Sequence, residues 1–132
     1  MQDSAVLLLV VEDDPATGNE VKRALEEAGF RVLLVASGEK ATTAFDENAG
    51  ELGGLIADVK LGGNVSGWDV ARHARETNQE LPVVYITGFY VEAWASQGVP
   101  KSILVQKPFA PAQIITAISS LLNASSSTLT AG

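Results

Sequence analysis

The chain of 132 residues contains no cysteine. A disulfide framework, a thiolate metal site and a cysteine nucleophile are therefore excluded, whereas the cellular compartment is constrained only weakly. Basic residues are scarce too: nine Lys and Arg stand against sixteen Asp and Glu, which gives a net charge of −7. Since this charge repels a phosphate backbone, we expect no direct binding to nucleic acid.

Long apolar runs are also missing. The longest one near the start, Ala5 to Val11, is too short to span a bilayer, and no basic segment precedes it as a secretion signal requires. We therefore expect a cytoplasmic protein that does not contact a membrane.

The composition is that of an ordinary folded domain, with 46% hydrophobic and 19% charged residues. A chain of this length can bury one hydrophobic core, and we predict a single domain over residues 1–123. Residues 124–132 are rich in Ser and Thr and carry no charge. We interpret them as a disordered tail or the start of a linker.

Short apolar runs alternate with longer segments of helical period, which is typical of βαβ units around a parallel sheet. The expected strands are 5–11, 31–35, 54–58, 83–87 and 102–105. Each is followed by an expected helix, of which the fourth, Val91 to Gln97, has a weak pattern. Asp14 followed by Pro15 is a typical helix start, and Ser66 with Asp69 predicts a capping box.

Ionisable and hydroxyl side chains stand at the ends of four of these strands, namely Glu12, Asp13, Asp58, Thr87 and Lys107. Parallel strands bring their carboxyl ends to one edge of the sheet, where open α/β folds have their functional crevice. A purely structural sheet has little reason to gather such groups there. We therefore expect this edge to carry the functional site.

Gathering Glu12, Asp13 and Asp58 at one edge is costly by itself, because like charges raise each other's pKa. A hard divalent cation such as Mg²⁺ compensates, since it takes oxygen ligands and is commonly held by one or two carboxylates plus a phosphate. Lys107 can pair with a carboxylate at rest and with a phosphoryl oxygen after transfer, and Thr87 offers a hydroxyl donor.

Four pieces of sequence resemble the response-regulator receiver domain of two-component signal transduction, in its stand-alone or hybrid-kinase form. They are Leu8 to Pro15, Asp58, Thr87-Gly88 and Lys107-Pro108-Phe109, in the family's order and spacing. The resemblance covers nearly all of residues 5–123. It implies a flavodoxin-like, doubly wound, five-stranded parallel sheet of strand order 2-1-3-4-5, with helices on both faces.

The resemblance also implies a metal site for Mg²⁺ or Mn²⁺. Asp13 corresponds to the family's direct metal ligand, Glu12 to a ligand acting through water, and Asp58 to both ligand and phosphoacceptor. The backbone carbonyl of Lys60 would complete the protein's share of the metal shell.

Thr87 corresponds to the family's switch hydroxyl and Lys107 to its phosphate-pairing lysine, with the bond to Pro108 expected to be cis. The phosphoryl donor implied is a phosphohistidine on a sensor histidine kinase or a histidine phosphotransfer protein. Asp58 would become an acyl phosphate that water later hydrolyses. The domain is then a phosphoacceptor that assists its own phosphorylation and dephosphorylation, and not a turnover enzyme.

Two departures from the family pattern concern loop shape and output. The loop from Val59 to Ser66 is one residue longer than in many relatives and lacks their Met-Pro pair. Leu104 occupies the position where the family often has an aromatic side chain that moves with the threonine. We therefore expect output through Thr87 and the segment Phe89 to Gln97. The expected signalling surface, and possible homodimer contact, comprises that segment, the strand 102–105 and the final helix.

Other functions fit less well. Each site residue alone is ordinarily a helix cap, a turn residue or a solvated lysine, as we accept for Asp14, and only the constellation overrides that interpretation. A docking module, or a phosphate sink without conformational output, remains the alternative. An aspartyl phosphatase needs a second acid where Lys60 stands, and flavin and dinucleotide sites lack their phosphate loops.

Overall fold

A computed structural model describes residues 5–131, with side chains up to residue 124. Within it, one parallel sheet has the strand order β2-β1-β3-β4-β5. The strands are β1 (Leu7–Val11), β2 (Arg31–Val35), β3 (Leu52–Asp58), β4 (Val83–Thr87) and β5 (Ser102–Gln106). The predicted sheet and its order are confirmed.

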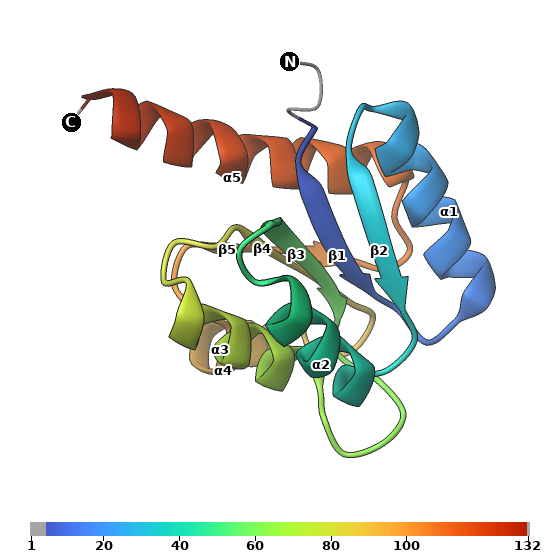
Figure 1. Ribbon diagram of the computed structural model, residues 1–132. Coiled ribbons are helices and arrows are strands. Elements are labelled where there is room, and N and C mark those ends of the chain that lie inside the picture. The colour runs from blue at the N-terminus through green and yellow to red at the C-terminus, as the bar shows by residue number, and fades with distance from the viewer. Residues whose placement is uncertain (1–4, 132) are drawn as a thin grey trace.

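Helices cover both faces of this sheet (Figure 1). They are α1 (Pro15–Glu27), α2 (Gly38–Asn48), α3 (Gly67–Thr77), the 3₁₀ turn η2 (Val91–Ala93), α4 (Trp94–Gln97) and α5 (Pro111–Ala131). In Figure 1, α1 and α5 lie on one side of the sheet, and α2, α3 and α4 on the other. None of the helices in the described part of the chain is long and apolar enough to cross a membrane.

The apolar run of β1 is explained by this two-sided cover. Leu8 and Val10 belong to the core under α1 and α5, whereas Leu9 and Val11 belong to the core under α2 and α3. All four side chains are buried. Successive strand residues point to opposite faces, so a strand buried on both faces must be apolar throughout.

β3 begins at Leu52, two residues before the expected strand 54–58, and β1 begins at Leu7, two residues after the expected start of 5–11. Two helical segments also differ from expectation. α4 is a single turn that follows the 3₁₀ turn, and this fits its weak apolar pattern. α5 runs on to Ala131, through residues 124–131 that we interpreted as a disordered tail or the start of a linker. Extending an existing helix costs far less than starting one, so Ser and Thr are tolerated there. The domain limit at residue 123 stays a prediction, and residue 132 lies outside the described part.

Candidate functional site

The carboxyl edge of the sheet holds a cavity of about 340 Å³ lined by the side chains predicted from the sequence. Its walls include Glu12, Asp13, Asp58, Lys60, Thr87 and Lys107. β1, β3 and β4 end here, and Lys107 follows β5 directly. The topology therefore brings together residues that lie up to 95 positions apart in the sequence, from 12 to 107.

Three carboxylates form the acidic part of the cavity. One oxygen each of Glu12, Asp13 and Asp58 lies within 4.8 Å of the others. Glu12 and Asp58 are 4% and 3% exposed, while Asp13 faces solvent. Glu12 Oε2 accepts the main-chain N–H of Asp14 at 3.0 Å, but Glu12 Oε1 is buried without a hydrogen bond. Two acids are therefore removed from water with one oxygen unsatisfied.

Asp14, which we assigned to capping, does cap α1. Its side chain accepts the main-chain N–H of Thr17 at 3.1 Å and also contacts the Thr17 hydroxyl. These two hydrogen bonds lower the pKa of the Asp14 carboxyl. The third acid of the Glu-Asp-Asp run thus belongs to the helix end and not to the carboxylate cluster.

Lys107 is the basic side chain that pairs with Glu12 and Asp58. Its Nζ donates to Asp58 Oδ2 at 2.6 Å and lies 3.7 Å from Glu12 Oε1. Burial disfavours the charged amine, but the hydrogen bond to Asp58 and the surrounding carboxylates outweigh it and raise the Lys107 pKa. The peptide bond from Lys107 to Pro108 is cis, as expected.

Glu12 shows the cost of this arrangement. The pKa of its carboxyl is raised from 4.5 to about 7, mainly by burial. The hydrogen bond from the Asp14 N–H lowers this pKa, and the Asp58 charge raises it further. One lysine thus compensates the acids only in part. A cation that accepts carboxylate oxygens would complete the compensation.

Thr87 ends β4 with its side chain buried. Its Oγ1 accepts the main-chain N–H groups of Phe89 at 3.3 Å and Tyr90 at 3.0 Å. The hydroxyl therefore holds the start of the segment that leads into α4. Phe89 is 85% exposed, so this segment presents an apolar side chain to solvent beside the cavity.

The donor set fits a hard divalent cation. Three carboxylates within reach of one another, one of them with a buried oxygen that accepts no hydrogen bond, offer the ligands that Mg²⁺ prefers. The main-chain carbonyl of Lys60, from a residue that lines the same cavity, can add a neutral oxygen. An open site of this kind leaves most of the coordination shell to water and phosphate.

Sequence reasoning missed Glu39, on the first turn of α2, which contacts the loop that borders the cavity. Its Oε2 accepts the main-chain N–H of Asn64 at 3.1 Å, in the loop that follows Asp58. The two residues are 25 positions apart, so no local pattern could have revealed the contact.

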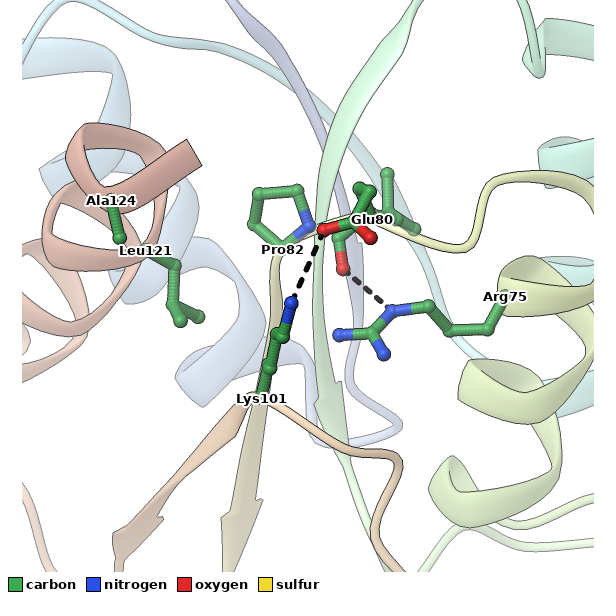
Figure 2. A pocket seen from close by; sticks show the side chains of 7 residues that line it. Arg75, Glu80, Pro82, Lys101, Leu121 and Ala124 are labelled. Atoms are coloured by element: carbon green, nitrogen blue, oxygen red, sulfur yellow. Dashed lines mark hydrogen bonds and ion pairs between the residues drawn. The ribbon is translucent and has the colours of Figure 1, made fainter. Parts of the chain in front are cut away.

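A second cavity, of about 270 Å³, lies at the opposite edge of the sheet, where β4 and β5 begin (Figure 2). Arg75 donates to the carbonyl oxygens of Leu81 at 2.8 Å and Pro100 at 2.7 Å. Lys101 and Glu80 form an exposed ion pair at 3.7 Å. The charges lining this cavity are satisfied or solvated.

Known proteins share both the sequence pattern and this fold. The family model of the response regulator receiver domain matches residues 8–119. The transcriptional regulatory protein CusR of Escherichia coli is 31% identical over 117 residues, which are 87% of this chain and 50% of CusR. The chain thus spans about half the length of curated relatives such as CusR.

Two crystal structures illustrate the likeness in fold. A response regulator receiver protein from Sinorhizobium medicae superposes with a TM-score of 0.89 at 41% identity, covering 93% of this chain and 98% of that one. The receiver domain of the sensor histidine kinase PA1611 from Pseudomonas aeruginosa, with magnesium coordinated in its active-site cleft, has a TM-score of 0.76 at 20% identity, covering 91% and 99%.

The family follows from the agreement of three findings. The family model spans most of the sequence, the strand order is that of its structural relatives, and the acidic pocket suits a phosphoacceptor. Receiver domains accept phosphoryl groups and are not turnover enzymes, and they act together with histidine kinases and downstream targets. The chain belongs to the response regulator receiver domain family of two-component signal transduction.

Proposed function

We propose that Asp58 accepts a phosphoryl group from a phosphohistidine on a sensor histidine kinase or a histidine phosphotransfer protein. One observation carries the proposal: the buried Asp58 carboxylate lies 2.6 Å from Lys107 Nζ and within 4.8 Å of two further acids. A structural ion pair does not need two additional buried or adjacent carboxylates. A phosphoryl group with its metal ion does.

The transfer forms a bond between an Asp58 carboxylate oxygen and phosphorus while the P–N bond of the donor breaks. The imidazole keeps the electron pair of that bond and takes up a proton. Lys107 is placed to follow the charge, because it can leave the carboxylate oxygen and pair with a phosphoryl oxygen. Hydrolysis reverses the modification, since water attacks phosphorus and returns the Asp58 carboxylate and inorganic phosphate.

Mg²⁺, or Mn²⁺ in its place, is the proposed cofactor. When bound, the ion neutralises charge on the equatorial phosphoryl oxygens. Asp13 and Asp58 would hold it directly, Glu12 through water, and Lys60 through its main-chain carbonyl. Glu12 Oε1, which is buried without a hydrogen bond and lies 3.7 Å from the Lys107 amine, supports an occupant at this position.

Thr87 is the proposed link from the phosphoryl group to the surface. Turning its hydroxyl toward a phosphoryl oxygen would take the acceptor away from the N–H groups of Phe89 and Tyr90. The segment Phe89 to Gln97 would then shift, and Gly88 gives its backbone the freedom to follow. Leu104, half-buried in β5, cannot supply an aromatic partner to this movement.

The proposed signalling surface comprises η2, α4, β5 and α5, and the same face would serve a homodimer. Phe89, Tyr90, Val91 and Trp94 are the exposed large apolar side chains of the described chain, and they lie in or next to this face.

We propose a cytoplasmic location, where histidine kinases present their phosphohistidines. The alternative, a docking module or a phosphate sink without conformational output, is not favoured. A docking module needs neither the acids nor the lysine, and Thr87 connects the site to the segment that follows β4.

A small phosphodonor with Mg²⁺ tests the phosphoacceptor proposal. Intact mass should show one added phosphoryl group that hydroxylamine removes, and Asp58→Asn should abolish it. Labelling that persists in Asp58→Asn would move the acceptor to another residue and refute the proposal.

A further inference from the structure

The loop from Val59 to Ser66 joins the end of β3 to α3 and borders the acidic cavity. The N–H of Ser66 donates to Asp69 in the capping box of α3, and two further main-chain N–H groups of the loop donate to carboxylates from elements that precede it. Gly62 donates to Asp13 Oδ2 at 3.2 Å, and Asn64 donates to Glu39 Oε2 at 3.1 Å. Since neither Asp13 nor Glu39 belongs to the loop, the end of β1 and α2 both contribute to its conformation, in addition to the capping box of α3.

The first turn of α2 is shaped to receive this loop. A Cβ at Gly38 would lie 2.3 Å from the carbonyl oxygen of Val65, so only glycine permits the observed approach. Glu39 follows at the helix start, where the helix dipole favours an acidic side chain. Gly63 has a positive φ of 92°, and a Cβ there would lie 3.0 Å from Glu39 Oε2. The Glu39 carboxylate therefore fits directly against the turn at Gly63 and Asn64.

Metal binding would affect the hydrogen bonds to Asp13 and to Glu39 differently. Asp13 is a proposed metal ligand, and its Oδ2 now accepts the Gly62 N–H over a long 3.2 Å. A cation competes for that carboxylate. Glu39 stands outside the carboxylate cluster and can keep its bond to Asn64 throughout.

We propose that Glu39 is a positioning residue for the metal site. It keeps the loop, and with it the Lys60 carbonyl, against the cavity when Asp13 engages a cation. This inference rests on the proposed function. It assigns to α2 a residue that holds the loop beside the proposed metal site. It also explains how a loop without a Met-Pro pair keeps a defined shape.

Glu39→Ala, which lacks the acceptor oxygen, should weaken Mg²⁺ binding about threefold to tenfold. This is less than the effect of removing a hydrogen-bond partner of a ligating side chain, because Glu39 contacts the loop and not a ligand side chain. Glu39→Gln keeps an oxygen for the Asn64 N–H and should stay within about twofold of the parent. Glu47→Ala removes an exposed acid near the other end of α2 and should change nothing. Mg²⁺ titration followed by NMR gives the dissociation constants, and amide exchange of Asn64 should accelerate in Glu39→Ala alone.

Parental Mg²⁺ affinity in Glu39→Ala would overturn the inference and leave the phosphoacceptor proposal standing. Equal weakening in Glu39→Ala and Glu39→Gln would overturn it as well, because charge and not loop position would then be responsible. A parent protein that binds no Mg²⁺ would refute the proposed metal site itself.

Discussion

The two edges of the sheet carry cavities of comparable size, about 340 Å³ at the carboxyl edge and about 270 Å³ at the amino edge, and both are lined by acidic and basic side chains. At the amino edge, Arg75 is satisfied by two carbonyl oxygens, and Glu80 and Lys101 meet in solvent, 72% and 77% exposed (Figure 2). At the carboxyl edge, two acids are buried together and one oxygen has no hydrogen bond.

The comparison shows that charge alone does not mark a functional site. The charged groups at the amino edge can be explained by the fold. Arg75 bonds the carbonyl oxygens of two loop residues, and Glu80 and Lys101 remain hydrated. The carboxyl edge holds a group of like charges that the fold leaves incompletely compensated, which is costly without a ligand. Matched substitutions at the two edges should therefore differ in their effects.

The largest difference is expected for the two lysines. Lys107→Met should slow phosphorylation by a small phosphodonor about a hundredfold or more, because the developing phosphoryl charge loses its fixed counter-charge. Lys101→Met removes the same charge at the amino edge and should phosphorylate at the parental rate. Stopped-flow fluorescence or timed intact mass gives both rates. Similar rates in the two variants would remove Lys107 from the transfer step.

Metal binding should separate the acids in the same way. Asp13→Asn should weaken Mg²⁺ binding about tenfold or more, because it removes a direct anionic ligand. Glu80→Gln, with the same loss of net charge, should bind the ion as the parent does. Calorimetric or NMR titration measures both. An unaffected Asp13→Asn would mean that the metal site is misassigned.

The substitutions above lower a rate or an affinity, whereas removal of the Glu12 charge should raise the stability of the fold. Its pKa is raised from 4.5 in the unfolded chain to about 7 in the metal-free fold, so folding favours the protonated form. That contribution is complete below about pH 4.5 and is lost as pH rises through 7. At pH 8, Glu12→Gln should therefore raise the free energy of unfolding by about 1 to 3 kcal/mol.

The gain from Glu12→Gln should vanish near pH 4.5, where the parent is already protonated. Glu80→Gln should change stability by less than about 0.5 kcal/mol at either pH, because its ion pair is exposed. Urea unfolding without metal at the two pH values provides the test. A destabilised Glu12→Gln at pH 8 would show that the buried carboxylate is well compensated by Lys107 alone.

The smallest effect concerns backbone movement. With Mg²⁺ and beryllofluoride as a phosphoryl mimic, amide exchange should change over residues 88–98, because Thr87 no longer holds the N–H groups of Phe89 and Tyr90. Residues 78–82 at the amino edge should keep their exchange rates. If changes in exchange stay within the acidic pocket, the proposed link through Thr87 is wrong, and the domain acts as a phosphate sink without conformational output.

Much of the fold was predictable, because its signals are local. The apolar run before Glu12, the cap at Asp14 and the capping box at Ser66 each correspond to an observed element. The start of β3 at Leu52 was less clear, since Gly53 and Gly54 interrupt the apolar pattern. The helical end of α5 was missed, because Ser and Thr indicate little helix preference until a helix already precedes them.

That the candidate site residues share one cavity was predictable from the ends of the strands, because parallel topology alone brings those ends together. The Glu39 contact was not, since it depends on how a loop folds back onto a helix that lies 25 positions earlier. The sequence could not show that Glu12 Oε1 is buried without a hydrogen bond either, because the burial and hydrogen bonding of one atom depend on the packed structure.

The most direct test of the central claim is to locate the phosphoryl group without changing the protein. After treatment with a small phosphodonor and Mg²⁺, borohydride reduces an aspartyl phosphate to homoserine, and tandem mass spectrometry of the digest places that residue. The account predicts homoserine at position 58, formed only with both donor and Mg²⁺. Homoserine at Asp13 or Asp14, or at no position despite added phosphate, would contradict it.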